Sequence, residues 1–205
     1  MKTHILPANS QDSLGIILQA LQAGGLVAFP TDTVYGIGAM AFNDDAVKSI
    51  YLAKGRTNEK AIPILLGEAE EIEKVASAVP AMARRLAERF WPGPLTLVIP
   101  KNATLPESVS STDTVGVRIP DNPTTHALLR LAGPMAVTSA NISGGLSPST
   151  AQEVYDQLGG RIELILDGGK TSGGIPSTVV DCTKSEPIIL RDGPVSLKEI
   201  ISALT

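Results

Sequence analysis

Short apolar runs alternate with amphipathic segments along most of the chain, and this alternation constrains the fold more than any other feature of the sequence. Runs such as Leu26–Phe29, Leu95–Pro100 and Thr114–Pro120 have the length and composition of buried strands. Between such runs, segments such as Ala81–Phe90 and Leu197–Leu204 carry apolar residues at helical spacing. An interleaved order of strands and helices predicts an α/β fold with a mixed, twisted sheet and flanking helices.

Other local signals extend this prediction. Asn43 or Asp44 is expected to start one helix, and Asn122 is expected to cap another, with Pro123 in its first turn. The run Ala61–Gly67 resembles a strand, and its Pro63 favours an edge strand or a bulge. No linker, repeat or low-complexity segment divides the sequence, so we expect one domain over residues 1–205.

Composition narrows the functional class. The net charge is −4 and only 3% of the residues are aromatic, which argues against a broad nucleic-acid-binding face. The single cysteine, Cys182, cannot form an internal disulfide, and this fits a reducing compartment. The N-terminus lacks the apolar stretch of a signal peptide, and no run approaches the ~18 apolar residues of a membrane span. We therefore expect a cytoplasmic protein with no membrane partner.

Several familiar catalytic motifs are absent. The segment Gly36–Ala41 matches a dinucleotide-binding pattern in letters only, because it lies too far from the preceding strand and from the next helix. The segment Gly168–Gly174 lacks the leading glycine of a P-loop, whose position holds Leu164. His4 and His126 have no companions at metal-ligand spacing, so the sequence predicts neither a metal site nor a serine-histidine triad.

The segment FPTDTVYGIGAMA, residues 29–41, leaves an apolar strand and presents short polar side chains directly behind a proline. Such residues can form only a turn, or they can form the rim of a binding cleft. The segment YLAKGRTNEK, residues 51–60, has a similar ambiguity because it gathers three cations in an acidic chain. It is either a solvated helix end that complements the helix dipole or a cradle for polyphosphate.

Polar residues also follow other predicted strands. Arg118 ends an apolar strand, which requires an anionic partner from the protein or from a ligand; a structural salt bridge and a ligand clamp both remain open. The segment TSAN, residues 138–141, follows a strand, Ser177 precedes one and Arg191 ends one. Strand ends are where α/β sheets commonly gather ligand-binding groups.

The motifs FPTDTVYGIGAMA, KGR, FWPGPLTLVIP, VGVRIPDNP, TSANISGG, GIPSTVVD and LRDG occur in the order seen in the YrdC family of threonylcarbamoyl-AMP synthases, and the chain resembles that family from about Gly24 to Gly193. The resemblance implies an open α/β fold with a concave, electropositive cleft. It implies that L-threonine, bicarbonate and ATP, with Mg²⁺ and no organic cofactor, give threonylcarbamoyl-adenylate, pyrophosphate and water. It further implies that a tRNA-modifying transferase complex consumes the product at the adenosine beside the anticodon, with at most weak tRNA contact by this chain.

The resemblance also implies roles for individual residues. Lys54 and Arg56 are the residues implied for catalysis. The TSAN residues would lie between the two ligands, with Thr138 on the threonine side. The implied threonine contacts are Thr33, Arg118, Thr138 and Ser177, and the implied ATP contacts are Arg56, Lys60, Thr114, Ser139, Asn141 and Arg191.

Three features depart from the longer members of the family. Thr57 stands where those members often have a proline, and Leu65 stands where they have a histidine. The chain ends at Thr205, without the extra C-terminal domain of the longer relatives. Two alternatives to a threonylcarbamoyl-AMP synthase remain open: a paralogue with carbamoyl-adenylate chemistry, and a non-enzymatic module that binds structured RNA.

Overall fold

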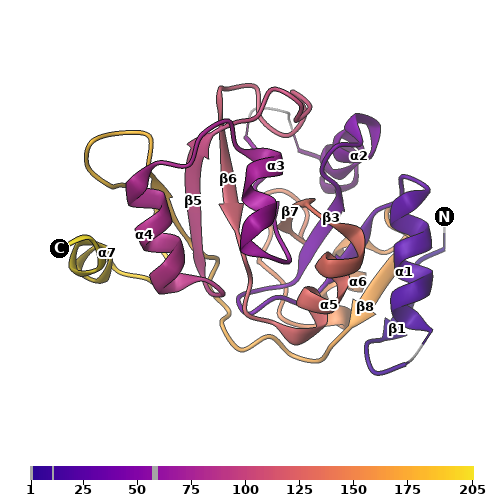
Figure 1. Ribbon diagram of the computed structural model, residues 1–205. Coiled ribbons are helices and arrows are strands. Elements are labelled where there is room, and N and C mark those ends of the chain that lie inside the picture. The colour runs from indigo at the N-terminus through magenta and orange to yellow at the C-terminus, as the bar shows by residue number, and fades with distance from the viewer. Residues whose placement is uncertain (1, 11, 57–59) are drawn as a thin grey trace.

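Ten strands form one mixed sheet in the computed structural model, which describes residues 2–10, 12–56 and 60–205 (Figure 1). The sheet order is β1-β8-β2-β3-β7-β4-β6-β5-β9-β10, with both parallel and antiparallel neighbours. The strands are β1 (His4–Pro7), β2 (Val27–Phe29), β3 (Gly36–Met40), β4 (Ile64–Leu65), β5 (Leu95–Pro100), β6 (Thr114–Arg118), β7 (Met135–Ser139), β8 (Leu164–Asp167), β9 (Thr178–Asp181) and β10 (Ile188–Arg191).

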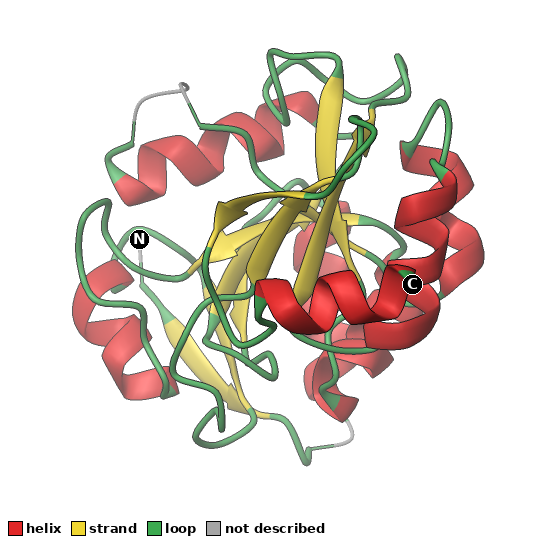
Figure 2. Cartoon of the chain, turned by 90° about the vertical axis from the view of Figure 1, so that its left-hand side faces the viewer, coloured by secondary structure: helices red, strands yellow, loops and turns green. Residues whose placement is uncertain are grey.

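Helices flank both faces of this sheet (Figure 2). Two predicted N-caps are confirmed, because the side chains of Asn43 and Asn122 accept hydrogen bonds from the backbone N–H groups of Ala46 and Thr125. The helices are α1 (Ser13–Gln22), α2 (Asp44–Lys54), α3 (Ile72–Val75, preceded by the 3₁₀ turn Ala69–Glu71), α4 (Ala81–Phe90), α5 (Pro123–Ala132), α6 (Ala151–Leu158) and α7 (Leu197–Leu204). Every helix among the described residues is too short or too polar to cross a lipid bilayer.

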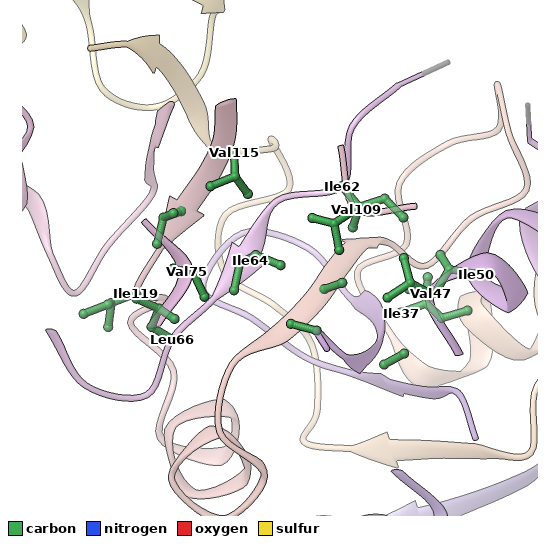
Figure 3. Packing of buried hydrophobic residues seen from close by; sticks show 14 of the residues in the cluster. Ile37, Val47, Ile50, Ile62, Ile64, Leu66, Val75, Val109, Val115 and Ile119 are labelled. Carbon is green, nitrogen blue, oxygen red and sulfur yellow. The ribbon is translucent and has the colours of Figure 1, made fainter. Parts of the chain in front are cut away.

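The core lies on both faces of the sheet. In β2, Val27 and Phe29 join the cluster that includes α1 and α5, while Ala28 belongs to the cluster on the opposite face. Successive side chains of a strand point to opposite faces of the sheet, so the short buried strand β2 contributes to the core on both faces. On the second face, Ile37 of β3 lies close to Val47 and Ile50 of α2 (Figure 3).

The predicted α/β class with a mixed twisted sheet is confirmed, but the strand predictions missed β3 and β1. β3 pairs along its whole length with β7, and its glycines are required there. A Cβ at Gly36 would lie 2.6 Å from Val137 Cγ1, and a Cβ at Gly38 would lie 2.8 Å from Val137 Cγ2. Glycine is unfavourable inside a strand, so the strand propensity of β3 is low. The close packing of β3 against β7 explains why glycines are present there.

The position predicted for the strand in residues 61–67 is wrong. β4 lies between β7 and β6 in the middle of the sheet, although Pro63 favoured an edge or a bulge. Pro63 precedes the two-residue strand, and its carbonyl accepts a hydrogen bond of 2.9 Å from Val137 N. The missing proline N–H therefore falls just before the ladder rather than within it.

Candidate functional site

A cleft of about 390 Å³ opens on one side of the sheet and collects residues from segments far apart in the chain. Its lining includes the turn after β2, the end of α2, the residues around β4, the C-terminal end of β6, the loop after β7 and the end of β10. The resemblance predicted ten of the lining residues: Thr33, Lys54, Arg56, Lys60, Arg118, Thr138, Ser139, Asn141, Ser177 and Arg191.

Thr114 is the exception among the predicted contacts. It stands at the opposite end of β6 from Arg118, and it does not line the cleft formed by the described residues. Its hydroxyl lies 3.0 Å from that of Thr112, which places its hydrogen bonding within its own loop. The cleft thus does not support Thr114 as a nucleotide contact.

The floor of the cleft is small and apolar. Gly36 and Val137 lie on adjacent strands, and Pro63 and Leu65 extend the apolar surface. Leu65 is buried, and its backbone pairs directly with that of Arg118. The position where longer relatives have a histidine therefore supplies apolar contact here, not a hydrogen bond. Thr57, the other substituted position, lies outside the described residues.

The turn between β2 and β3 holds its threonines in a defined order. Thr31 Oγ1 donates to the carbonyl of Val34 at 2.7 Å, and it lies 3.0 Å from Thr33 Oγ1. Because the Thr31 proton is used in the first contact, Thr33 is the donor in the second. The Thr125 hydroxyl of α5 also bonds to the Pro30 carbonyl and fixes the start of the turn. Both Thr31 and Thr33 are buried residues that line the cleft.

Arg118 is held on three sides at the edge of this turn. Its Nε donates to the Gly93 carbonyl at 2.9 Å, its Nη1 to Thr33 Oγ1 at 3.1 Å and its Nη2 to Asp32 Oδ1 at 2.5 Å. Only 6% of the Arg118 side chain is exposed. The salt bridge that the sequence left open therefore exists, yet Arg118 also lines the cleft, so both interpretations apply to one residue.

Lys54 is buried at the end of α2 and does not face water. Its Nζ donates to the carbonyls of Ser139 and Asn141, with Asn141 Oδ1 at 3.5 Å. The Lys54 carbonyl in turn accepts from Ser143 N at 2.9 Å. Lys54 thus anchors the loop after β7, and the solvated-helix-end interpretation fails for this residue.

The protonation of Lys54 should control ligand binding in this loop. Burial, with the charge of Arg56, lowers the pKa of Lys54 to about 8. The charged form with its three donors is present below that pH and is lost above it. We therefore expect nucleotide binding to weaken as pH rises from about 7 to about 9. ATP titration calorimetry across this range checks this, with Lys54→Met as a control that shows no such transition. Equal pH profiles for the two proteins would contradict it.

Arg56 and Lys60 form the outer part of the basic motif. Arg56 Nη2 donates to the Lys60 carbonyl at 2.6 Å, Nη1 lies 3.5 Å from Thr138 Oγ1, and the guanidinium lies 5.5 Å from the centre of the Tyr51 ring. Its buried Nε has no partner among the described residues. Lys60 is exposed. Arg56 and Lys60 both line the cleft, so two cationic side chains lie in this part of it.

Ser177 and Arg191 line the cleft and contact each other. Arg191 donates through Nε and Nη2 to the Ser177 carbonyl at 3.0 and 2.7 Å, and through Nη2 to Ser177 Oγ at 3.0 Å. Ser177 Oγ also lies 2.8 Å from Thr96 Oγ1. This network holds Arg191, the third arginine that lines the cleft, in place.

Gly193 allows this network to form. A Cβ at Gly193 would lie 2.4 Å from Thr178 N and 2.7 Å from both Pro176 O and Ser177 C, which are backbone atoms. We expect Gly193→Ala to lower the free energy of unfolding by about 1–3 kcal/mol because of this overpacking. Chemical denaturation checks the value. Gly15→Ala is the control, since a Cβ there meets nothing within 4 Å and alanine favours the interior of α1. Equal effects of both changes would contradict the close contact.

Chemically, the cleft suits two anionic ligands. Three arginines and Lys60 supply positive charge, and hydroxyl and amide groups lie among them. Within the described residues, no group of three or more His, Cys, Asp or Glu side chains could hold a metal ion. The fold and the cleft define an α/β protein with an anion-binding site.

The comparisons identify the family. Residues 19–193 match the model of the Sua5/YciO/YrdC family, whose description reads "Telomere recombination". The chain belongs to this family, as the motifs predicted.

Individual relatives are similar over most of the chain. The threonylcarbamoyl-AMP synthase of Pyrococcus abyssi is 46% identical over 88% of this chain and 54% of that protein. The synthase of Bacillus subtilis is 43% identical over 88% of this chain and 53% of that protein. A crystal structure of P. abyssi Sua5 complexed with L-threonine matches with a TM-score of 0.95 and 42% identity, over 98% of this chain and 61% of that chain. The chain thus spans about half the length of the two curated relatives.

Sequence reasoning missed several residues of the site. Thr96, Ser143 and Gly144 line the cleft, and Asp32 pairs with Arg118. Thr96 lies on β5 between Leu95 and Leu97, which are fully buried in the core. Its side chain points to the opposite face of the strand and lines the cleft. Thr96 could have been found from the sequence, because it is a single polar residue between two apolar residues of a predicted strand. Asp32 stood in the polar segment behind Pro30 that the sequence singled out, but nothing in the sequence paired it with Arg118, because the two residues are 86 positions apart.

Proposed function

We propose that this chain is a threonylcarbamoyl-AMP synthase that converts L-threonine, bicarbonate and ATP into threonylcarbamoyl-adenylate, pyrophosphate and water. One observation carries the proposal: a single cleft joins the hydroxyl–arginine set around Thr33 and Arg118 to the cationic set around Arg56 and Arg191. The names of the P. abyssi and B. subtilis relatives support the same activity.

The threonine end of the cleft is proposed around Arg118. Three of its five N–H groups are used by the protein, which leaves donors for a carboxylate. Thr33, Thr138 and Ser177 supply hydroxyls around it, and Leu65 with Val137 supplies apolar surface. A relative that binds L-threonine in a crystal structure supports L-threonine as the ligand.

The nucleotide end is proposed at the loop after β7 and the basic motif. Arg56, Lys60 and Arg191 would bind phosphate oxygens, and Ser139 and Asn141 would contact the nucleotide beside them. Lys54 acts here by holding that loop through the Ser139 and Asn141 carbonyls. Since its donors are all used, we assign it the positioning of the loop and leave phosphate contact to Arg56.

The reaction fits a site without an enzyme nucleophile. The threonine amine attacks the carbon of bicarbonate, an N–C bond forms, and oxygen leaves as water to give a carbamate. A carbamate oxygen then attacks the α-phosphorus of ATP, the bond to the bridging oxygen breaks, and pyrophosphate leaves. Both steps require aligned reactants and neutralised negative charge, which the arginines and hydroxyls supply.

Magnesium is proposed only as a companion of the triphosphate. Among the described residues, no group of three or more His, Cys, Asp or Glu side chains lies together to hold it. When bound to ATP, Mg²⁺ would share in neutralising the phosphate charge. Every step above is assigned to residues of this chain.

The proposed activity also indicates which enzyme would use the product and where in the cell this would happen. The product is a reactive mixed anhydride, so an enzyme that transfers the threonylcarbamoyl group to tRNA would have to consume it, and a weak tRNA contact fits such delivery. These steps would take place in the cytoplasm. We propose that residues 1–205 act as one YrdC-like domain, because all ten described strands share one sheet.

Isotope tracing tests the proposal. Incubation with ATP, L-threonine and ¹³C-bicarbonate should give an adenylate whose mass contains both threonine and the label. An adenylate without threonine, formed when carbamoyl phosphate replaces threonine and bicarbonate, would favour the carbamoyl-adenylate paralogue, for which Leu65 in the cleft is the motivating observation. RNA binding without any adenylate would favour the non-enzymatic module.

A further inference from the structure

Asp32 contacts the proposed threonine site only through Arg118. It is absent from the cleft lining formed by the described residues, yet its carboxylate pairs with the guanidinium that lines the cleft. We infer that Asp32 is a positioning residue that orients Arg118 toward the carboxylate of the amino-acid substrate. This inference rests on the proposed function and adds a residue to it.

The environment of Asp32 makes Arg118 its main partner. Only 12% of the Asp32 side chain is exposed, and Oδ2 is buried without a hydrogen-bond partner among the described residues. The segment around Gly173 packs against the same turn, since a Cβ at Gly173 would lie 2.6 Å from Asp32 O, and Gly174 N donates to Thr33 O at 2.8 Å. A buried carboxylate needs a charged or hydrogen-bonding partner, and Arg118 is the one that the described residues provide for Asp32.

The contacts of Arg118 show what Asp32 contributes. Gly93 O fixes the Nε side of the guanidinium, and Thr33 Oγ1 and Asp32 Oδ1 each take one terminal nitrogen. A planar guanidinium held at three points has a fixed orientation, and its remaining N–H groups have fixed directions. Without Asp32, the Nη2 side would lose its only charged partner and the plane could turn.

Asp32 also sets the local charge. Arg191 lies close enough that its charge contributes to lowering the pKa of Arg118, after the larger effect of burial. Two arginines and one aspartate leave a net charge of +1 at this end of the cleft. That surplus matches one carboxylate, and Asp32 offsets part of the repulsion between the two guanidinium groups before the substrate binds.

Two other roles for Asp32 predict different behaviour. A purely structural ion pair would change stability but not the affinity for threonine. A carboxylate that occupies Arg118 in place of the substrate would compete with it, so removing its charge would tighten threonine binding. Affinity and melting temperature, measured together, separate the three roles.

The test compares Asp32→Asn with Glu68→Gln. Glu68 pairs with Arg130 in an exposed ion pair outside the cleft and serves as a matched control. We expect Asp32→Asn to weaken L-threonine binding by roughly tenfold in calorimetry, with ATP affinity near the parental value, because neighbouring charged partners are strongly coupled. Glu68→Gln should leave both affinities unchanged. In a double-mutant cycle with Arg118→Lys, the two losses should not add.

Parental threonine affinity in a folded Asp32→Asn protein would overturn the inference, and tighter binding would show competition instead. If Asp32→Asn does not fold, Asp32→Glu keeps the charge but displaces the guanidinium, and it should show the same selective loss for threonine. Failure of the parent protein to bind L-threonine would remove the proposed function and this inference together. Binding by the parent with no change in either variant would remove the inference alone.

Discussion

Arg118→Lys is expected to weaken L-threonine binding by roughly tenfold to a hundredfold, or about 1.5–3 kcal/mol, while ATP binding stays near the parental value. Lysine keeps the charge but cannot reach the Gly93 carbonyl, Thr33 Oγ1 and Asp32 Oδ1 at once. It also cannot present a planar pair of donors to a carboxylate.

The same change should lower the melting temperature, because Asp32 and Arg118 form a buried ion pair whose geometry lysine does not reproduce. Stability alone therefore does not distinguish a clamp from a salt bridge. Titration calorimetry with threonine and with ATP does so, beside a melting curve and an Arg130→Lys control in the exposed pair. A less stable Arg118→Lys protein with parental threonine affinity would remove Arg118 from the substrate site.

Arg56→Ala is expected to lower ATP affinity by about 1.5–3 kcal/mol, the loss of one charge-assisted contact, and to leave threonine affinity nearly unchanged. Arg56 lines the cleft and its guanidinium is only partly used by the protein, through Nη2 to the Lys60 carbonyl and Nη1 to Thr138 Oγ1, so it keeps N–H groups for a phosphate. Lys60→Ala should have a smaller effect because its side chain is exposed and flexible.

Lys48→Ala provides the control for Arg56→Ala. Lys48 lies on α2, as does Lys54, but pairs with Asp44 on the exposed face, outside the cleft. ATP calorimetry on the three variants decides between a phosphate contact and a nonspecific cation. Parental ATP affinity in Arg56→Ala would mean that the basic motif only orders its own loop.

The fold class and ten of the residues that line the cleft could be predicted from the sequence, and the reasons are physical. Local capping by Asn43 and Asn122 depends on residues three positions away, so it can be predicted from the sequence. The polar residues at strand ends, such as Arg118, meet in one cleft because the sheet brings those ends together.

The features that could not be predicted from the sequence depend on contacts between residues far apart in the chain. β3 contains Gly36 and Gly38, whose fit against Val137 of β7 is visible only when the two strands pair. The position of Asp32 beside Arg118 depends on the turn after β2, which no local pattern specifies. The central place of β4 likewise depends on its neighbours rather than on Pro63.

The most direct test of the account is pyrophosphate release from ATP, with L-threonine and bicarbonate added separately and together. A synthase that must first form a carbamate has no acceptor for the adenylyl group unless both co-substrates are present. We therefore expect release well above background only with both, and a strongly reduced release in Arg56→Ala when the ATP concentration is below saturation. Equal release with ATP alone, or with either co-substrate alone, would contradict the proposed reaction.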